Sequence, residues 1–129
     1  MSRAIIFLDD LHKFEKQNQT WSVPLEQRLA APVRVEESYA VESNEADALK
    51  DKTHHVLAWL LGESANLKEQ LEAHLLSQLL LDNSASPLRK ALEKCEFASA
   101  PSPMCGLEDS NREMSFMCGI EGSNVEDAD

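Results

Sequence analysis

Apolar residues recur at helical spacing near the start of the chain and again, more strongly, in its middle, with a less regular stretch between. Residues 2–17 carry them three or four positions apart, which predicts a helix, although a short strand over 4–8 competes with it. A second, short helix is predicted after Ser22, with Pro24 in its first turn. Residues 33–41 alternate only in part, so we expect an extended or irregular segment.

Residues 44–81 carry the strongest hydrophobic pattern. Gly62 interrupts it, and Asn66 followed by Glu69 resembles a capping box that starts a new helix. The segment is therefore a helical hairpin that turns near Gly62 or a single long helix, and the two cap signals favour the hairpin. An apolar stripe as wide as the one in its second half is buried against other elements or another chain. Its leucines recur every four residues, at Leu67, Leu71, Leu75 and Leu79.

The pattern changes again near the end of the chain. Ser86-Pro87 opens a last helix, which ends near Phe97. Residues 98–129 are rich in Ser, Pro, Asn and acids and have no sustained period, which predicts disorder. We therefore expect an all-α domain over 1–97 with a central helical hairpin or long helix, followed by a disordered acidic tail. The alternative is an α+β fold with a short two-stranded element.

A ten-residue unit occurs twice in the predicted tail. MCGLEDSNRE (104–113) and MCGIEGSNVE (117–126) are identical at seven of ten positions. The repeat is either a neutral duplication or a short binding motif used twice, which would raise avidity on a flexible tether. In the second interpretation the partner-binding positions are the apolar anchors and the acid that follows them: Met104, Leu107, Glu108, Met117, Ile120 and Glu121.

Charge and cysteine content limit the classes of partner. The 129 residues carry a formal net charge of −11, and residues 98–129 contribute more than half of it, with one Arg and seven acids. Such a chain is repelled by phosphate backbones and anionic lipid, so neither nucleic acid nor a membrane is expected as a partner. No run of apolar residues is long enough to span a bilayer, and no secretory signal is recognised. Three cysteines, an odd number, favour a reducing, cytoplasmic compartment.

Motifs that would indicate catalysis are incomplete. IIFLDDLH (5–12) has the shape of a Walker B segment, but the chain has no glycine-rich P-loop to hold phosphate. The four histidines form no H-x-x-x-H pair and the cysteines no C-x-x-C pair, so no metal site is predicted. We therefore expect a protein that is not an enzyme and has no cofactor.

The sequence favours a non-catalytic protein-interaction module, such as an adaptor, a chaperone-like protein or a regulatory protein. Its partner would be another protein or a second copy of the chain, bound by the leucine stripe and the tail motifs. One alternative is an acidic mimic of nucleic acid that inhibits a DNA-binding protein. Another is a thiol-based redox or metal-responsive switch at Cys105 and Cys118. The acidic strip of the mimic would comprise Glu36, Glu37, Glu42, Glu45, Asp47 and Asp51.

Overall fold

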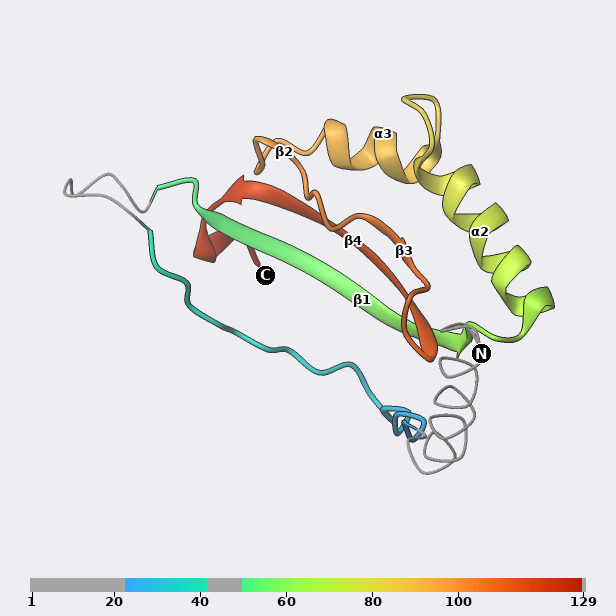
Figure 1. Cartoon of the computed structure of the whole chain (residues 1–129). Helices are drawn as coiled ribbons and strands as arrows, with labels where there is room; N and C mark the ends of the chain where they lie inside the picture. Colours follow the sequence, from blue (N-terminus) through green and yellow to red (C-terminus); the bar gives the residue numbers. More distant parts are fainter. Residues whose placement is uncertain (1–22, 42–49, 129) are drawn as a thin grey trace, which may run out of the picture.

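The computed structural model describes residues 23–41 and 50–128. Figure 1 shows an antiparallel sheet with two helices beside it. The elements, in chain order, are β1 (Thr53–Glu63), α2 (Leu67–Leu81), α3 (Pro87–Glu93), β2 (Ala100–Pro101), β3 (Gly106–Glu108), β4 (Glu113–Ser123) and the 3₁₀ helix η3 (Val125–Ala128).

Strand β4 is the centre of the sheet. It pairs with β1 along one edge and with the short strands β2 and β3 along the other, and every pairing is antiparallel. The register places Leu57 opposite Cys118 and Trp59 opposite Phe116, whose ring centroids are 6.1 Å apart. Helices α2 and α3 lie on the side of the sheet bordered by β2 and β3 (Figure 1), where α2 contacts β3 and α3 contacts β2.

The prediction of an all-α fold with a disordered tail is wrong, because the chain is α+β and residues from the predicted tail form β2, β3 and β4. The α+β alternative names the right class but not these strands. Residues 53–63, expected in the first arm of a helical hairpin, form β1. A continuous apolar run such as Val56–Leu61 has the same periodicity in a buried strand as in a buried helix, so β4, which is distant in sequence, decides the outcome.

The two predicted helix starts at Asn66 and Ser86 are confirmed. The side-chain oxygen of Asn66 accepts hydrogen bonds from the backbone amides of Lys68 and Glu69, at 3.3 and 3.5 Å. Its amide nitrogen donates to the Glu69 carboxylate at 2.8 Å. Ser86 precedes α3 with Pro87 at its first position, where the missing N–H costs nothing. The start of α2 is therefore set by a side-chain cap, whereas the start of α3 coincides with the Ser86-Pro87 step, at which the Ser86 side chain makes no cap hydrogen bond.

The segment before β1 is extended. Residues 23–41 contain no helix or strand, so the short helix predicted after Ser22 does not form in its described part, whereas an irregular 33–41 agrees with the expectation. The predicted helix over 2–17, the competing strand over 4–8 and the helix start near residue 44 lie outside the described residues. None of the described helices is long and apolar enough to cross a bilayer.

The buried hydrophobic core of the described part is very small. Only Met114 and Cys118 are fully buried among its apolar side chains, with 1% and 6% of their surface exposed. Both lie on β4, between the two flanking edges of the sheet. Backbone pairing along β4 therefore organises this unit more than side-chain packing does.

At Gly119, β4 lies so close to β1 that an added methyl group should destabilise the pairing of the two strands. A Cβ at Gly119 would overlap the His55 carbonyl oxygen and lie 2.9 Å from Val56 Cα, both of them backbone atoms that cannot rotate away. Gly119→Ala should therefore destabilise the β1–β4 pair by about 1–3 kcal/mol, the usual range for overpacking. Hydrogen exchange of the β1 and β4 amides should accelerate at least several-fold. Ser115→Ala on the same strand is the matched control, and equal exchange in the two variants would contradict the prediction.

Candidate functional site

The predicted leucine stripe lies on the outward side of α2. Its four members, Leu67, Leu71, Leu75 and Leu79, have exposed fractions of 78%, 60%, 52% and 71%, and Leu76 beside them is 54% exposed. The half-buried positions of the helix are Gln70, Ala73, Ser77, Leu80 and Leu81. At about 100° per residue these two sets occupy opposite sides of the helix. Helix α2 therefore contacts the rest of the unit through the side that carries Gln70, Ala73, Ser77, Leu80 and Leu81. The leucines of the stripe face the exterior.

The six predicted tail-motif residues lie in or beside the sheet. Met104 is exposed in the turn before β3, whereas the others are half-buried: Leu107 and Glu108 in β3, and Met117, Ile120 and Glu121 in β4. The first copy of the repeat thus supplies β3, and the second supplies most of β4, which pairs with it. The two copies are neighbouring parts of one sheet instead of two motifs on a flexible tether.

The two glycines that open the repeat units meet different requirements. Gly106 has a φ of +142°, which side chains rarely adopt, and a Cβ there would meet nothing within 4 Å. Gly119 has no such backbone requirement but faces the backbone of β1 too closely for a side chain. Glycine is therefore required at the same position of the two copies for different reasons: the backbone conformation at Gly106 and the lack of space at Gly119.

Each described histidine has its own polar partner. His54 Nδ1 lies 3.8 Å from the Glu121 carboxylate, and its ring contacts that of Tyr39. His55 Nε2 lies 3.0 Å from the carbonyl oxygen of Asn124. His12 lies outside the described residues. Within 23–41 and 50–128 no three His, Cys, Asp or Glu side chains converge where a metal ion could bind.

His74, Gln70 and Asp109 form a polar cluster that joins α2 to the end of β3. Asp109 Oδ2 accepts a hydrogen bond from Gln70 Nε2 at 3.1 Å and lies 2.9 Å from His74 Nε2. The hydrogen bond from His74 is the main cause that lowers the pKa of Asp109, followed by that from Gln70. This cluster was not predicted from the sequence, because 35 residues separate His74 from Asp109. The spacing of Gln70 and His74 by one helical turn was the available signal.

Arg28 and Glu113 fasten the extended segment to the sheet. Glu113 is buried, with its Oε1 3.0 Å from Arg28 Nη2, and its Oε2 accepts the Glu26 amide at 2.6 Å. The Arg28 guanidinium also donates to the carbonyl oxygens of Leu60 and Leu61, the first at 2.7 Å. Since these carbonyls belong to β1, Arg28 connects three parts of the chain.

Of the acidic strip of the nucleic-acid-mimic alternative, the structure describes Glu36, Glu37 and Asp51. Glu36 lies 2.8 Å from the Arg34 guanidinium. Asp51 is near Asn124, whose side-chain amide donates to its carboxylate at 3.2 Å. The members Glu42, Glu45 and Asp47 lie outside the described residues.

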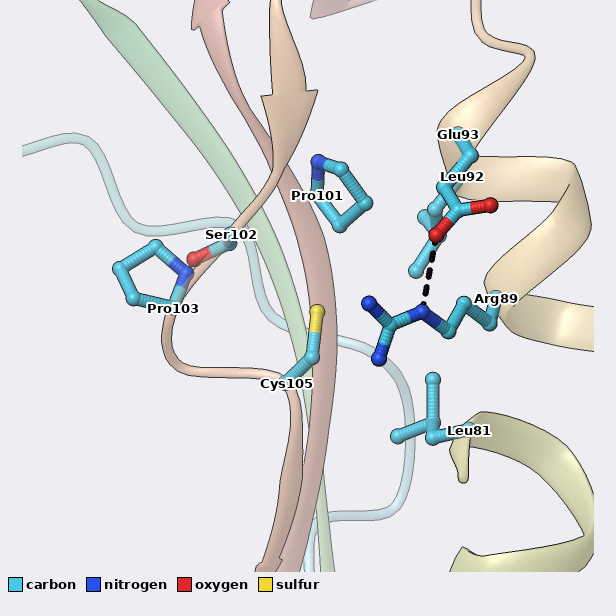
Figure 2. Close-up of a pocket in the computed structure, with 8 residues that line it drawn as sticks. All are labelled: Leu81, Arg89, Leu92, Glu93, Pro101, Ser102, Pro103 and Cys105. Carbon is cyan, nitrogen blue, oxygen red and sulfur yellow. Dashed lines mark hydrogen bonds and ion pairs between the residues drawn. The ribbon is translucent and has the colours of Figure 1, made fainter. Parts of the chain in front are cut away.

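A cavity of about 320 Å³ lies between the helices and the β2–β3 connection. Leu81, Arg89, Leu92 and Glu93 line it from the helices, and Pro101, Ser102, Pro103 and Cys105 line it from the other side. Figure 2 shows the Cys105 sulfur and the Arg89 guanidinium pointing into it from these two sides, with Arg89 Nε 2.8 Å from Glu93 Oε1. The lining of the cavity thus combines the Arg89–Glu93 ion pair and the Cys105 thiol with apolar side chains.

The chain is similar to part of a much longer kind of protein. It is 34% identical over 121 residues to a mitochondrial presequence protease of Xenopus tropicalis, which covers 94% of this chain but 12% of that protein. The Xenopus laevis protein of the same name is 33% identical over 121 residues, which again covers 94% of this chain and 12% of that protein. That of Emericella nidulans is 30% identical over 102 residues, 79% of this chain and 10% of that protein. No family model matches the chain.

These relatives overturn the expectation of a protein that is not an enzyme. Nearly the whole chain aligns with proteins named proteases, and the chain spans about an eighth of their length. The sequence alone does not reveal this, because a segment of an enzyme need not contain a complete catalytic motif.

Removal of the His74 side chain should return the pKa of Asp109 toward its ordinary value. The pKa is lowered in the folded chain, so the contact stabilises the fold above the ordinary Asp pKa and is lost as the pH falls through the lowered value. Carboxyl titration by NMR should show a higher pKa for Asp109 in His74→Ala than in the wild type. The pKa of Asp127, which Asn124 and Ser123 lower, is the internal control and should not move.

Arg28→Ala should loosen the extended segment, because the buried Glu113 carboxylate loses its ion partner. An unsatisfied buried polar group costs about 1–3 kcal/mol, so exchange of the Glu26 amide should accelerate about tenfold or more. Lys68→Ala removes only an exposed pair with Glu72 on α2 and serves as the control, with no change expected at Glu26. A Glu26 amide that exchanges equally in both variants would contradict the role of Arg28.

Proposed function

We propose that this chain forms a structural α+β segment of a peptidase of the presequence-protease kind. The observation that carries the proposal is the 34% identity that extends over 94% of the chain. On this proposal the whole protein cleaves presequence peptides, as the name of its relatives indicates, and the segment supports the catalytic part instead of containing a complete catalytic centre.

The distribution of apolar side chains supports a segment that is completed by more polypeptide. On β1, Leu57 and Trp59 are 63% and 47% exposed on one face, and Val56 and Leu60 are 37% and 39% exposed on the other. A strand that is apolar on both faces is typical of a sheet covered on both sides. The relatives are about eight times longer than the aligned segment, so they contain chain that could cover these faces.

The leucine face of α2, formed by Leu67, Leu71, Leu75, Leu76 and Leu79, is proposed as the main contact with that additional polypeptide. Burial of about five leucines contributes on the order of 1.5–3 kcal/mol each, which is enough to fix the position of the segment. A homodimer through the same face, which the sequence also suggested, is the competing occupant. The length of the relatives favours the first occupant, because it provides a cover within one protein.

The same comparison supports a proposal for the compartment. The cytoplasmic location expected from the cysteine content remains a prediction, whereas all the named relatives are mitochondrial proteins. We place the whole protein in the mitochondrion on this proposal. Its free cysteines would suit any reducing compartment.

A chimera tests the proposal. The aligned segment of the Xenopus tropicalis protease is replaced by this chain, and cleavage of a synthetic presequence peptide is measured. The chimera should retain cleavage, and the double substitution Leu71→Lys, Leu75→Lys should reduce it at least tenfold, because charges would be placed in the buried contact.

Lys90→Glu on α3 is the control, since Lys90 is exposed and lies outside the leucine face, and it should leave cleavage unchanged. A folded chimera without cleavage would refute the proposal. If the chain alone forms a stable dimer that the two Lys substitutions dissociate, while the same substitutions leave the chimera active, the leucine face is a dimer contact instead.

A further inference from the structure

Cys105 and Cys118 occupy equivalent positions in the two copies of the repeat and meet across the sheet. The pairing of β3 with β4 places Gly106 opposite Met117. Cys105 directly precedes Gly106, at the end of a turn in which its backbone amide donates to the Ser102 carbonyl oxygen, and Cys118 directly follows Met117 in β4. The two Met-Cys-Gly triplets therefore run past each other in opposite directions, with the cysteines at the centre.

The contacts of Cys105 place its sulfur beside Cys118. Its Sγ accepts a hydrogen bond from the backbone N–H of Gly119 at 3.2 Å and lies 3.4 Å from the carbonyl oxygen of the same residue. Gly119 directly follows Cys118 in β4. Burial raises the pKa of the Cys118 thiol, and the neighbouring Cys105 raises it further, as expected for two thiols at close range.

The hydrogen-bond pattern makes this pair geometrically suited to a covalent bond. Ser99 and Ser102 donate to the carbonyl oxygens of Glu121 and Gly119, so odd-numbered residues of β4 bond toward the β2 side. The backbone of Cys118, which pairs with Leu57, is therefore directed toward β1, and the Cys105 sulfur lies on the other side, against the backbone of the next residue, Gly119. A disulfide requires Cα atoms about 4.4–6.8 Å apart, and neighbouring strands, about 4.7–4.9 Å apart, provide such a spacing.

The two thiols differ in access to solvent. Cys105 is half-buried and lines the cavity shared with Arg89, and its sulfur points into that cavity in Figure 2. Cys118 is 6% exposed. A small oxidant that enters the cavity therefore meets Cys105 before Cys118. Neither cysteine is in a disulfide, and the third cysteine, Cys95, is also free.

We infer that Cys105 and Cys118 form a peroxide-responsive dithiol, in which Cys105 reacts first and Cys118 resolves the product into a disulfide. The Cys105 thiolate attacks one oxygen of hydrogen peroxide, the O–O bond breaks, and the departing hydroxide combines with the proton released by the thiol to form water. The Cys118 sulfur then attacks the Cys105 sulfenic acid, the S–O bond breaks, and that hydroxide takes the Cys118 proton as a second water. The two thiols lose two electrons in total, and the peroxide gains them.

The disulfide would change the coupling of β3 to β4. Only three residues of β3 pair with β4, whereas a covalent link one residue before β3 would hold the two strands together. Gly106 stands between Cys105 and the rest of β3, and its positive φ and open surroundings give the Cys105 peptide freedom to close the bond. Amides of β3 should therefore exchange more slowly in the oxidised chain.

The test uses the full chain, treated with hydrogen peroxide, alkylated, and analysed by intact mass and by tryptic peptides. The monomer should lose two hydrogen atoms and regain them with a thiol reductant. Trypsin cleaves after Lys94 and Arg112, so the disulfide should join the peptide 95–112 to a peptide that begins at Glu113.

Variants separate the three cysteines. Because 95–112 also contains Cys95, the joined peptides must persist in Cys95→Ser, which is the matched control. Cys118→Ser should leave Cys105 as a sulfenic acid that reacts with dimedone. The inference is overturned if peroxide produces no mass change, if it produces only disulfide-linked dimers, or if the joined peptides disappear in Cys95→Ser.

Discussion

The two-sided pairing of β4 is the constraint on which the rest of the structure depends. One edge of this strand bonds to β1 and the other to β2 and β3, so both of the fully buried apolar side chains in the described part, Met114 and Cys118, lie on it. The closeness of β1 excludes a side chain at Gly119. Glu113, at the start of β4, receives the extended segment through Arg28 and Glu26. The position of a residue along β4 thus determines its role. Gly119 allows the close approach of β1, Glu113 anchors the extended segment, and Met114 and Cys118 are buried.

A fold organised by backbone pairing around so small a core leaves much apolar surface exposed. Loss of conformational entropy on folding is offset mainly by apolar burial, and two buried side chains provide little of it. The apolar surface that stays exposed lies on the leucines of α2 and on both faces of β1. In the proposed larger peptidase, additional polypeptide would cover these faces together, whereas a partner that covers α2 alone would leave β1 exposed.

The sequence predicted the parts of this structure that depend on nearby residues. The starts of α2 and α3 were predictable because Asn66 and Ser86-Pro87 act within one helical turn. Strand β1 was not, because the apolar run Val56–Leu61 is compatible with helix or strand until β4, more than fifty residues later, pairs with it. The predicted disorder after residue 97 failed for a related reason. Short strands β2 and β3 have no period of their own and are ordered by their pairing with β4 and by their contacts with α3 and α2.

The repeat is the feature whose meaning changes most when the sheet is known. An antiparallel pair of similar segments brings equal residues together only at its centre, and here that centre is the cysteine position. The copies are then made unequal by their surroundings, since Cys105 faces a cavity and Cys118 is enclosed between strands. Two thiols in equal environments would compete for an oxidant, whereas one accessible and one enclosed thiol react in sequence. A duplicated sequence can therefore supply two different chemical roles, because the sheet assigns a different environment to each copy.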